Sequence, residues 1–140
     1  MIRKKGNDRI GNRMVPELTY IMSNRVLIVD DEIDICLLLK SLLRSQSVES
    51  SFVQTLADAE KTIEQLQPSI LFLDMNLPDG NGIQKIELFK KQSPNTNIIM
   101  MSAYDTIEDR RKALEKGADI FLSKPFTRKQ ILDIVHQIPS

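Results

Sequence analysis

Short apolar runs alternate with amphipathic stretches from Arg25 onward, and this alternation constrains the fold more than any other feature of the sequence. The run at 26–29 is continuously apolar and stops abruptly at acidic residues, as expected of a strand buried on both faces. The same reasoning predicts strands at 26–29, 48–53, 70–73, 98–101 and 120–122, and helices at 32–45, 58–67, 83–91, 106–116 and 127–138. Five strands that alternate with five helices require right-handed crossovers and a mostly parallel sheet covered on both faces.

The strand order follows from how apolar each run is. The run at 48–53 is the weakest and is therefore the expected edge strand, whereas the runs at 26–29 and 70–73 are the most apolar and should be central. This predicts a doubly wound, flavodoxin-like α/β fold with strand order 2-1-3-4-5 and helices on both faces. Ligands bind such sheets at the carboxyl ends of the strands, in the crevice between strands 1 and 3.

The first 24 residues differ in composition from the rest of the chain. They hold five basic and two acidic side chains, together with Gly6, Gly11 and Pro16, and they show no helical or strand periodicity. The basic residues are followed by no apolar segment of the kind that a signal peptide needs. We therefore expect 1–24 to be a disordered basic leader and 25–140 to be one domain.

Charge and hydropathy exclude several classes of protein. Nineteen basic and nineteen acidic side chains cancel, which argues against nucleic-acid binding driven by bulk charge. The longest apolar runs span only a few residues, so no membrane segment is expected. Cys36 is the single cysteine, which excludes an intramolecular disulfide. These features predict a cytoplasmic domain whose function lies in a localised site.

Polar residues follow four of the five predicted strands at the end where ligands are expected. They are Asp30 and Asp31 after the first strand, Asp74 after the third, Ser102 after the fourth and Lys124 after the fifth. Taken singly, an Asp or Ser could cap a helix, and a lysine could simply lie in water. The second strand is expected to contribute nothing. Because parallel strands bring their carboxyl ends to one edge, the five residues together predict a site.

The residue types at this edge favour phosphoryl chemistry. Three carboxylates in one crevice repel each other unless a cation joins them. Oxygen ligands without nearby His or Cys favour Mg²⁺, which commonly takes a phosphate as a further ligand. A carboxylate can attack phosphorus, while Lys124 and the Ser102 hydroxyl could contact the phosphoryl oxygens. The residues thus predict a site that accepts a phosphoryl group.

Four segments of the sequence resemble the receiver domain of two-component response regulators. They are Val26–Asp31 followed by Glu32, the segment Leu71-Phe72-Leu73-Asp74-Met75-Asn76-Leu77-Pro78-Asp79-Gly80-Asn81-Gly82, Met101-Ser102-Ala103, and Lys124-Pro125-Phe126. The resemblance covers roughly residues 25–138. It implies a phosphoacceptor regulator rather than an enzyme, one that assists only its own phosphorylation and dephosphorylation.

The resemblance also implies a role for each site residue. Asp74 would be the phosphoacceptor, and Ser102 and Lys124 would contact the phosphoryl oxygens. Mg²⁺, with Mn²⁺ as an alternative, would be held directly by Asp31, Asp74 and the backbone carbonyl of Asn76, and largely through water by Asp30. These roles are expectations of family likeness and do not follow from spacing alone.

A switch and a set of partners follow from the same resemblance. Phe121 stands where family members have an aromatic residue that turns inward on activation; the alternative is an ordinary core aromatic of its strand. Activation would remodel the surface of the fourth helix, fifth strand and fifth helix, and the peptide between Lys124 and Pro125 would be cis. The expected partners are a sensor histidine kinase or phosphotransfer protein and an unknown output protein, without direct contact to nucleic acid or membrane.

Two alternatives remain open at the level of sequence. One is a receiver-shaped docking module that acts independently of phosphorylation. The other is a Mg²⁺-dependent small-molecule phosphohydrolase, although such an enzyme generally needs a second acid two residues after the nucleophile, where this chain has Asn76. Because the sequence ends at Ser140, just past the last predicted helix, we expect either a stand-alone receiver or a fragment of a longer regulator.

Overall fold

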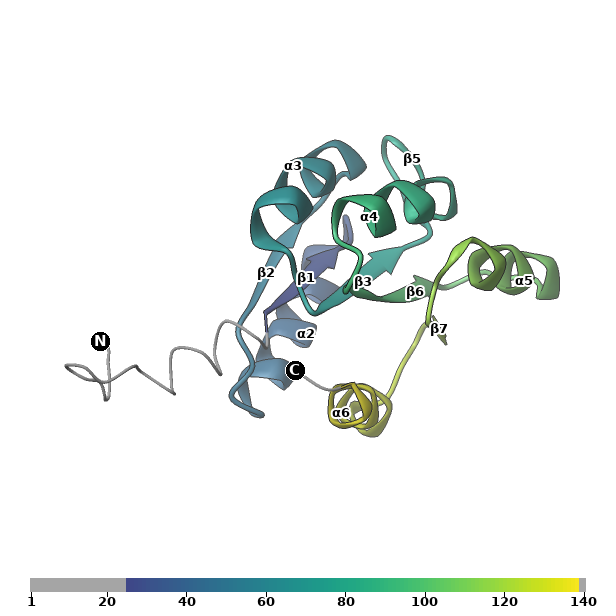
Figure 1. The fold of residues 1–140 in the computed structure, drawn as a ribbon. Coiled ribbons are helices and arrows are strands. Elements are labelled where there is room, and N and C mark those ends of the chain that lie inside the picture. Colours follow the sequence, from purple (N-terminus) through teal and green to yellow (C-terminus); the bar gives the residue numbers. More distant parts are fainter. Residues whose placement is uncertain (1–24, 139–140) are drawn as a thin grey trace.

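A single five-stranded parallel sheet with helices on both faces forms the centre of the computed structural model, which describes residues 25–138 (Figure 1). The strand order is β2-β1-β3-β6-β7, where β6 and β7 are the fourth and fifth strands of the sheet. This confirms the predicted doubly wound order 2-1-3-4-5. The basic leader expected at 1–24 lies outside the described residues.

The strands occupy the predicted positions, with shifts of one or two residues at their ends. Their bounds are β1 Val26–Val29, β2 Ser50–Val53, β3 Ile70–Asp74, β6 Asn97–Ser102 and β7 Ile120–Ser123. Every residue of β1 and β3 is buried, whereas β2 is partly exposed along its length, as expected of an edge strand. The strand predicted from position 48 begins at Ser50, because pairing with β1 starts there. Val48 is nevertheless buried.

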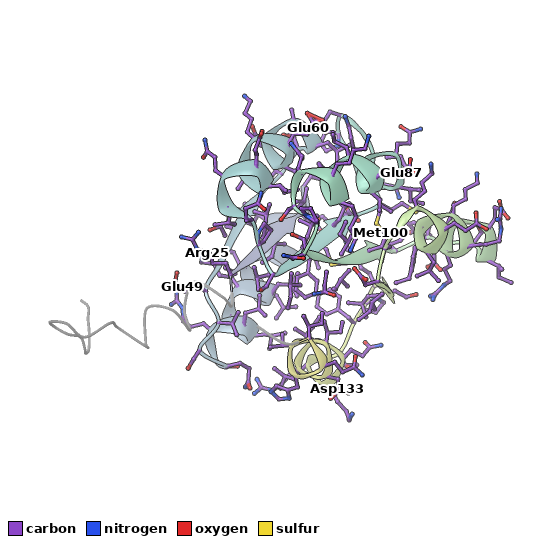
Figure 2. All side chains as sticks on the ribbon, in the orientation of Figure 1. Arg25, Glu49, Glu60, Glu87, Met100 and Asp133 are labelled. Atoms are coloured by element: carbon purple, nitrogen blue, oxygen red, sulfur yellow. The ribbon has the colours of Figure 1, made fainter. Side chains whose placement is uncertain are left out.

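Two apolar clusters fill the space between the sheet and its two helical layers. The helices are α2 Ile33–Arg44, α3 Leu56–Leu66, α4 Ile86–Gln92, α5 Ile107–Lys116 and α6 Arg128–Gln137. Alternate residues of each strand face opposite layers, so Leu27 and Leu71 pack with α3 and α4, whereas Ile28 and Phe72 pack with α2 and α6. In Figure 2, Glu60 and Glu87 mark the layer of α3 and α4, Asp133 marks α6, and Met100 lies between them in the sheet.

The ends of the helices are set by capping contacts. Thr106 and Thr127 form capping boxes with Asp109 and Gln130, at the starts of α5 and α6. The helix predicted from position 58 begins earlier, at Leu56, because the Thr55 side chain accepts a hydrogen bond from the Asp58 backbone N–H. The helix predicted at 83–91 is preceded by a 3₁₀ turn, η1 Gly82–Lys85, and only then continues as α4.

A small hairpin follows β3 and leads the chain into η1. Its strands, β4 Asn76–Leu77 and β5 Gly80–Asn81, pair antiparallel. Asp79 at its turn accepts hydrogen bonds from the backbone N–H groups of Leu56 and Ala57, so the hairpin is tied to the start of α3. A Cβ atom at Gly82 would lie 2.5 Å from the carbonyl oxygen of Asp74, which explains why a glycine stands there. The hairpin therefore closes tightly against the end of β3.

Candidate functional site

The predicted site residues lie at the carboxyl edge of the sheet, on four different strands. Asp74 is the last residue of β3 and Ser102 the last of β6, while Asp30 and Lys124 directly follow β1 and β7. Val29 pairs in register with Leu73, which brings Asp30 level with Asp74 on neighbouring strands. The topology of the parallel sheet thus brings together residues that lie far apart in the sequence.

Three carboxylates gather at this edge. Asp30, Asp31 and Asp74 each offer one oxygen, and these oxygens all lie within 4.8 Å of one another. Asp30 is fully buried and Asp74 is 5% exposed, whereas Asp31 is exposed. The cluster therefore extends from the interior of the sheet edge to the surface. Oxygen donors of this kind suit a hard divalent cation such as Mg²⁺.

Lys124 reaches into the cluster and does not lie in water. Its Nζ is 2.7 Å from Asp30 Oδ2, 2.9 Å from Glu32 Oε1 and 3.4 Å from Asp74 Oδ1, and its side chain is 9% exposed. Burial disfavours the charged ammonium, but hydrogen bonds and attraction from these carboxylates outweigh it and raise the pKa of Lys124 above its ordinary value. Lys124 is therefore a fixed positive charge beside Asp74.

The Asp74 carboxyl group is held in an environment that resists ionisation. Burial raises its pKa to about 6, with a further contribution from the charge of Asp30, and Lys124 offsets only part of the effect. The group is still mostly ionised at neutral pH, which a nucleophile requires. Any added positive charge in the cluster would favour the ionised form further.

Asp30 has a buried oxygen with spare capacity for a ligand. Its Oδ1 accepts a hydrogen bond of 2.9 Å from the backbone N–H of Glu32. Its Oδ2 is held by the ammonium of Lys124 at 2.7 Å and has no other partner among the residues that the structure describes. The alternative role of Asp30 or Asp31 as a helix cap is not what is observed, because Glu32 is the N-cap of α2. The oxygen set, with a buried oxygen that still has a free lone pair, fits a site for Mg²⁺ or its bound water.

The Ser102 hydroxyl is fully buried beside the cluster and engages the loop that follows β6. It donates to the carbonyl oxygen of Tyr104 at 3.0 Å and accepts from the Tyr104 backbone N–H at 3.2 Å. The backbone N–H of Lys124 donates to the carbonyl of Ser102 at 2.8 Å, which joins the ends of β6 and β7. Ser102 is therefore linked both to the site lysine and to the entry of α5.

The remaining predicted residues lie around this centre. Asn76 opens the hairpin as the first residue of β4 and is exposed. Phe121 lies in β7, is partly exposed, and packs against the cluster that includes α3 and α4. The Lys124–Pro125 peptide is cis, as expected.

Three further residues contact the site or its aromatic neighbour and were not singled out from the sequence. Glu32 pairs with Lys124 at 2.9 Å, and the Arg110 guanidinium lies 4.8 Å from the centre of the Phe121 ring. Gln54, directly after β2, donates to the carbonyl oxygen of Asp31 at 3.2 Å. The end of the second strand thus contacts the backbone of the β1 loop, while the carboxylate cluster itself consists of Asp30, Asp31 and Asp74.

Comparison with known proteins gives consistent results across sequence and structure. A family model described as "Response regulator receiver domain" matches residues 26–136. The swarming motility regulation protein RssB of Serratia marcescens is 31% identical over 113 residues, which cover 81% of this chain and 52% of the relative. The phosphate regulon transcriptional regulatory protein PhoB of Escherichia coli is 32% identical, covering 79% of this chain and 49% of that protein. The chain thus spans about half the length of these relatives.

Solved structures of similar fold include isolated receiver domains. The beryllofluoride-activated NtrC4 receiver domain dimer has a TM-score of 0.78 at 34% identity, covering 82% of this chain and 95% of that one. A CheY-like receiver domain protein from Methanospirillum hungatei has a TM-score of 0.78 at 28% identity, with coverage of 81% and 91%. Among the helices that the structure describes, none is both long enough and apolar enough to cross a bilayer.

Proposed function

This chain belongs to the response regulator receiver domain family, and from that premise we propose that Asp74 is its phosphoacceptor. The observation that best supports this assignment is the convergence on Asp74 of a buried lysine and two further carboxylates from other strands. A nucleophile that accepts a phosphoryl group needs an ionised oxygen and positive charge for the transferred oxygens. The Asp74 carboxylate and the Lys124 ammonium meet both needs.

The proposed donor is a phosphohistidine on a sensor histidine kinase or a phosphotransfer protein. One oxygen of the Asp74 carboxylate attacks phosphorus while the bond between phosphorus and the histidine nitrogen breaks. The histidine ring leaves as a neutral imidazole after taking up a proton. Asp74 needs no separate base, because its attacking carboxyl group is already ionised. Lys124, already 3.4 Å from Asp74 Oδ1, is placed to pair with the negative phosphoryl oxygens.

The residues that would hold Mg²⁺ are Asp31, Asp74 and the backbone carbonyl of Asn76, with Asp30 acting through water. When bound, Mg²⁺ (or Mn²⁺ in its place) neutralises charge on the carboxylates and on the phosphoryl group. Asp31 is the exposed member of the cluster, so it is accessible from solvent. Gln54 fixes the backbone of Asp31 through its carbonyl oxygen and thereby orients that ligand.

Phosphorylation is proposed to act through Ser102 and Phe121. A phosphoryl group on Asp74 would draw the Ser102 hydroxyl toward it, Phe121 would move inward, and the surface of α5, β7 and α6 would change. An output protein, still to be identified, would read that surface, without direct contact of this chain to nucleic acid or membrane. We propose that this signalling occurs in the cytoplasm.

The decisive experiment uses a small phosphodonor and a single substitution. Intact-mass spectrometry after incubation with acetyl phosphate and Mg²⁺ should show one added phosphoryl group on the wild-type protein and none on Asp74→Asn. Asp133→Asn is the matched control, since Asp133 lies on α6 and pairs only with Lys129 among the described residues. The assignment is wrong if Asp74→Asn is phosphorylated as the wild type is, or if the wild type is never phosphorylated by either acetyl phosphate or a phosphohistidine donor.

A further inference from the structure

Phe121 lies between the apolar interior and a single arginine. Its ring packs against the apolar cluster of the sheet and the α3–α4 layer. The guanidinium of Arg110 from α5 lies over the same ring, 4.8 Å from its centre. A guanidinium at this distance is attracted to the negative face of an aromatic ring. Phe121 has no hydroxyl group and cannot form a side-chain hydrogen bond. The guanidinium contact is therefore the electrostatic interaction that the described residues give its side chain.

Arg110 is itself held by two neighbours. Its Nε donates to Asp105 Oδ2 at 2.6 Å, and one of its terminal N–H groups donates to the Ser123 hydroxyl. The Ser123 hydroxyl in turn donates to Asp105 Oδ1 at 3.4 Å. The side chains of Arg110, Asp105 and Ser123 thus form a closed set of contacts beside Phe121, which we call the Arg110 clamp.

The Arg110 clamp is joined to the phosphorylation site at both of its ends. Ser123 directly precedes Lys124, whose backbone N–H donates to the Ser102 carbonyl. Asp105 directly follows Tyr104, whose backbone N–H and C=O are both bonded to the Ser102 hydroxyl. Any event that takes the Ser102 hydroxyl away from Tyr104 removes two bonds that fix the loop on which Asp105 lies.

We propose that Arg110 is a positioning residue that holds Phe121 in its outer position and that phosphorylation of Asp74 releases it. The proposal rests on the function assigned to Asp74 above. When a phosphoryl oxygen takes the Ser102 hydroxyl, the loop bearing Asp105 is freed, Arg110 loses an anchor, and Phe121 gives up the guanidinium contact as it moves inward. The contact between Arg110 and Phe121 therefore favours the unphosphorylated arrangement.

This coupling is reciprocal, so removing the guanidinium should make the phosphorylated arrangement easier to reach. The structure provides a matched control in the neighbouring Arg111, which is exposed on α5 and pairs there with Glu108 and Glu115. Arg110→Ala removes the ring contact and the anchor, whereas Arg110→Lys keeps the charge near Asp105 but lacks the flat guanidinium. Arg111→Ala removes a similar charge from the same helix and leaves the clamp intact.

The test is a titration of the four proteins with beryllofluoride and Mg²⁺, with the position of the Phe121 ring followed by fluorine NMR of a fluorinated phenylalanine at position 121. Given the strength of exposed cation–π contacts, Arg110→Ala should bind beryllofluoride about two- to fivefold more tightly than the wild type, with Arg110→Lys between them and Arg111→Ala unchanged. The fluorine signal of unliganded Arg110→Ala should shift part of the way toward that of the liganded wild type.

Unchanged or weaker beryllofluoride binding by Arg110→Ala, with an unshifted fluorine signal, would overturn the role of Arg110. Equal increases in beryllofluoride affinity in Arg110→Ala and Arg111→Ala would overturn it as well, because they would reflect the loss of a positive charge alone. Thermal melts show whether each variant is folded at the temperature of the titration. If Arg110→Ala is not, Arg110→Lys still tests the proposal. Failure of the phosphoacceptor assignment looks different, since the wild type would then bind no beryllofluoride or Asp74→Asn would bind it equally well.

Discussion

Lys124 is the single cation that faces the carboxylates of Asp30, Glu32 and Asp74 among the described residues, so charge in the site is not balanced by the protein alone. Glu32 is 61% exposed and contributes through water-screened attraction, whereas Asp30 and Asp74 are buried. The pKa of Asp74 is raised to about 6, mainly by burial and further by the charge of Asp30. Metal-free protein should therefore be less stable when Asp74 is ionised.

The first prediction is that Asp74→Asn stabilises the metal-free protein at neutral pH. The folded-state pKa of Asp74, about 6, lies above its value of 3.8 in the unfolded chain. The contribution of protonated Asp74 to the free energy of unfolding is therefore fully present below pH 3.8 and is lost as the pH rises through 6. The difference in stability between variant and wild type should grow between pH 4 and about 7, to on the order of 1–3 kcal/mol. Urea unfolding with a chelator present measures it.

The pH dependence distinguishes this effect from a general gain in packing. Asp133→Asn is the matched control, because it removes an exposed carboxyl group of α6 that is not part of the carboxylate cluster. A gain in Asp74→Asn that is constant with pH, or a loss at neutral pH, would contradict the raised pKa.

The second prediction concerns the stability that a divalent cation confers. The proposed cation site exists only in the folded chain, so Mg²⁺ at a hundred times its dissociation constant should stabilise the wild type by about 2.7 kcal/mol. Asp31→Asn should abolish most of this increase while leaving the fold intact, because the Asp31 side chain is exposed and Gln54 bonds its backbone carbonyl, which the substitution keeps. Thermal melts over a Mg²⁺ series measure it, and an undiminished response in Asp31→Asn would exclude Asp31 as a ligand.

The residues at the strand ends could be predicted from the sequence because a parallel sheet forces them together. Asp30, Asp74 and Lys124 each follow an apolar run, and the direction of the strands alone places them at one edge. Glu32, Gln54 and Arg110 could not be predicted in the same way. Their contacts depend on which way long, exposed side chains turn, and no periodic pattern in the sequence records that choice.

At the scale of elements, the sequence predicts the existence and type of each strand and helix but not the ends of each one. The start of α3 depends on Thr55 and on Asp79, which lies 23 residues further along the chain. The 3₁₀ turn before α4 depends on the close approach of Gly82 to the end of β3. Both features are tertiary contacts, so local helix signals place the boundary only approximately.

The third prediction tests how tightly the hairpin closes on Asp74, the proposed phosphoacceptor. In Gly82→Ala the added Cβ would lie 2.5 Å from the Asp74 carbonyl oxygen and 2.9 Å from Met100 Cε, so the backbone of Asp74 must shift. We expect a loss of about 1–3 kcal/mol in the free energy of unfolding, together with weaker binding of beryllofluoride. Urea unfolding and a beryllofluoride titration measure the two effects.

Gly117→Ala provides the matched comparison for this substitution. Gly117 has a φ of 118° at the end of α5, and a Cβ there would make ordinary van der Waals contacts, the nearest at 3.6 Å to a Lys90 side-chain carbon. It should also destabilise the fold, by roughly 1 kcal/mol of backbone strain, but without weakening beryllofluoride binding. Equal loss of binding in both variants would show that Gly82 matters only for stability.

At the scale of the whole molecule, the sheet separates two layers whose cores do not share side chains. One layer packs α3 and α4 against the sheet, and the other packs α2 and α6 (Figure 1). The carboxylate cluster lies where both layers end, because Asp30 is followed by α2 and Asp74 by the hairpin that leads to α4. A change at this edge can therefore be passed to either layer, and the contacts of Ser102 favour the side of α5 and β7.

The last prediction is that residues 25–138 fold and function without the basic leader, because they include every strand of the sheet and both of its cores. The deletion must spare Arg25, since its backbone carbonyl accepts hydrogen bonds from both the N–H and the hydroxyl of Ser69. A chain that begins at Asn24 should keep its stability within about 0.5 kcal/mol and its Mg²⁺-dependent phosphorylation by acetyl phosphate. A chain that begins at Val26 should lose about 1 kcal/mol, because the Ser69 donors are left without that acceptor. Urea unfolding compares the two, and a large loss in the longer one would show that the leader is part of the folded domain.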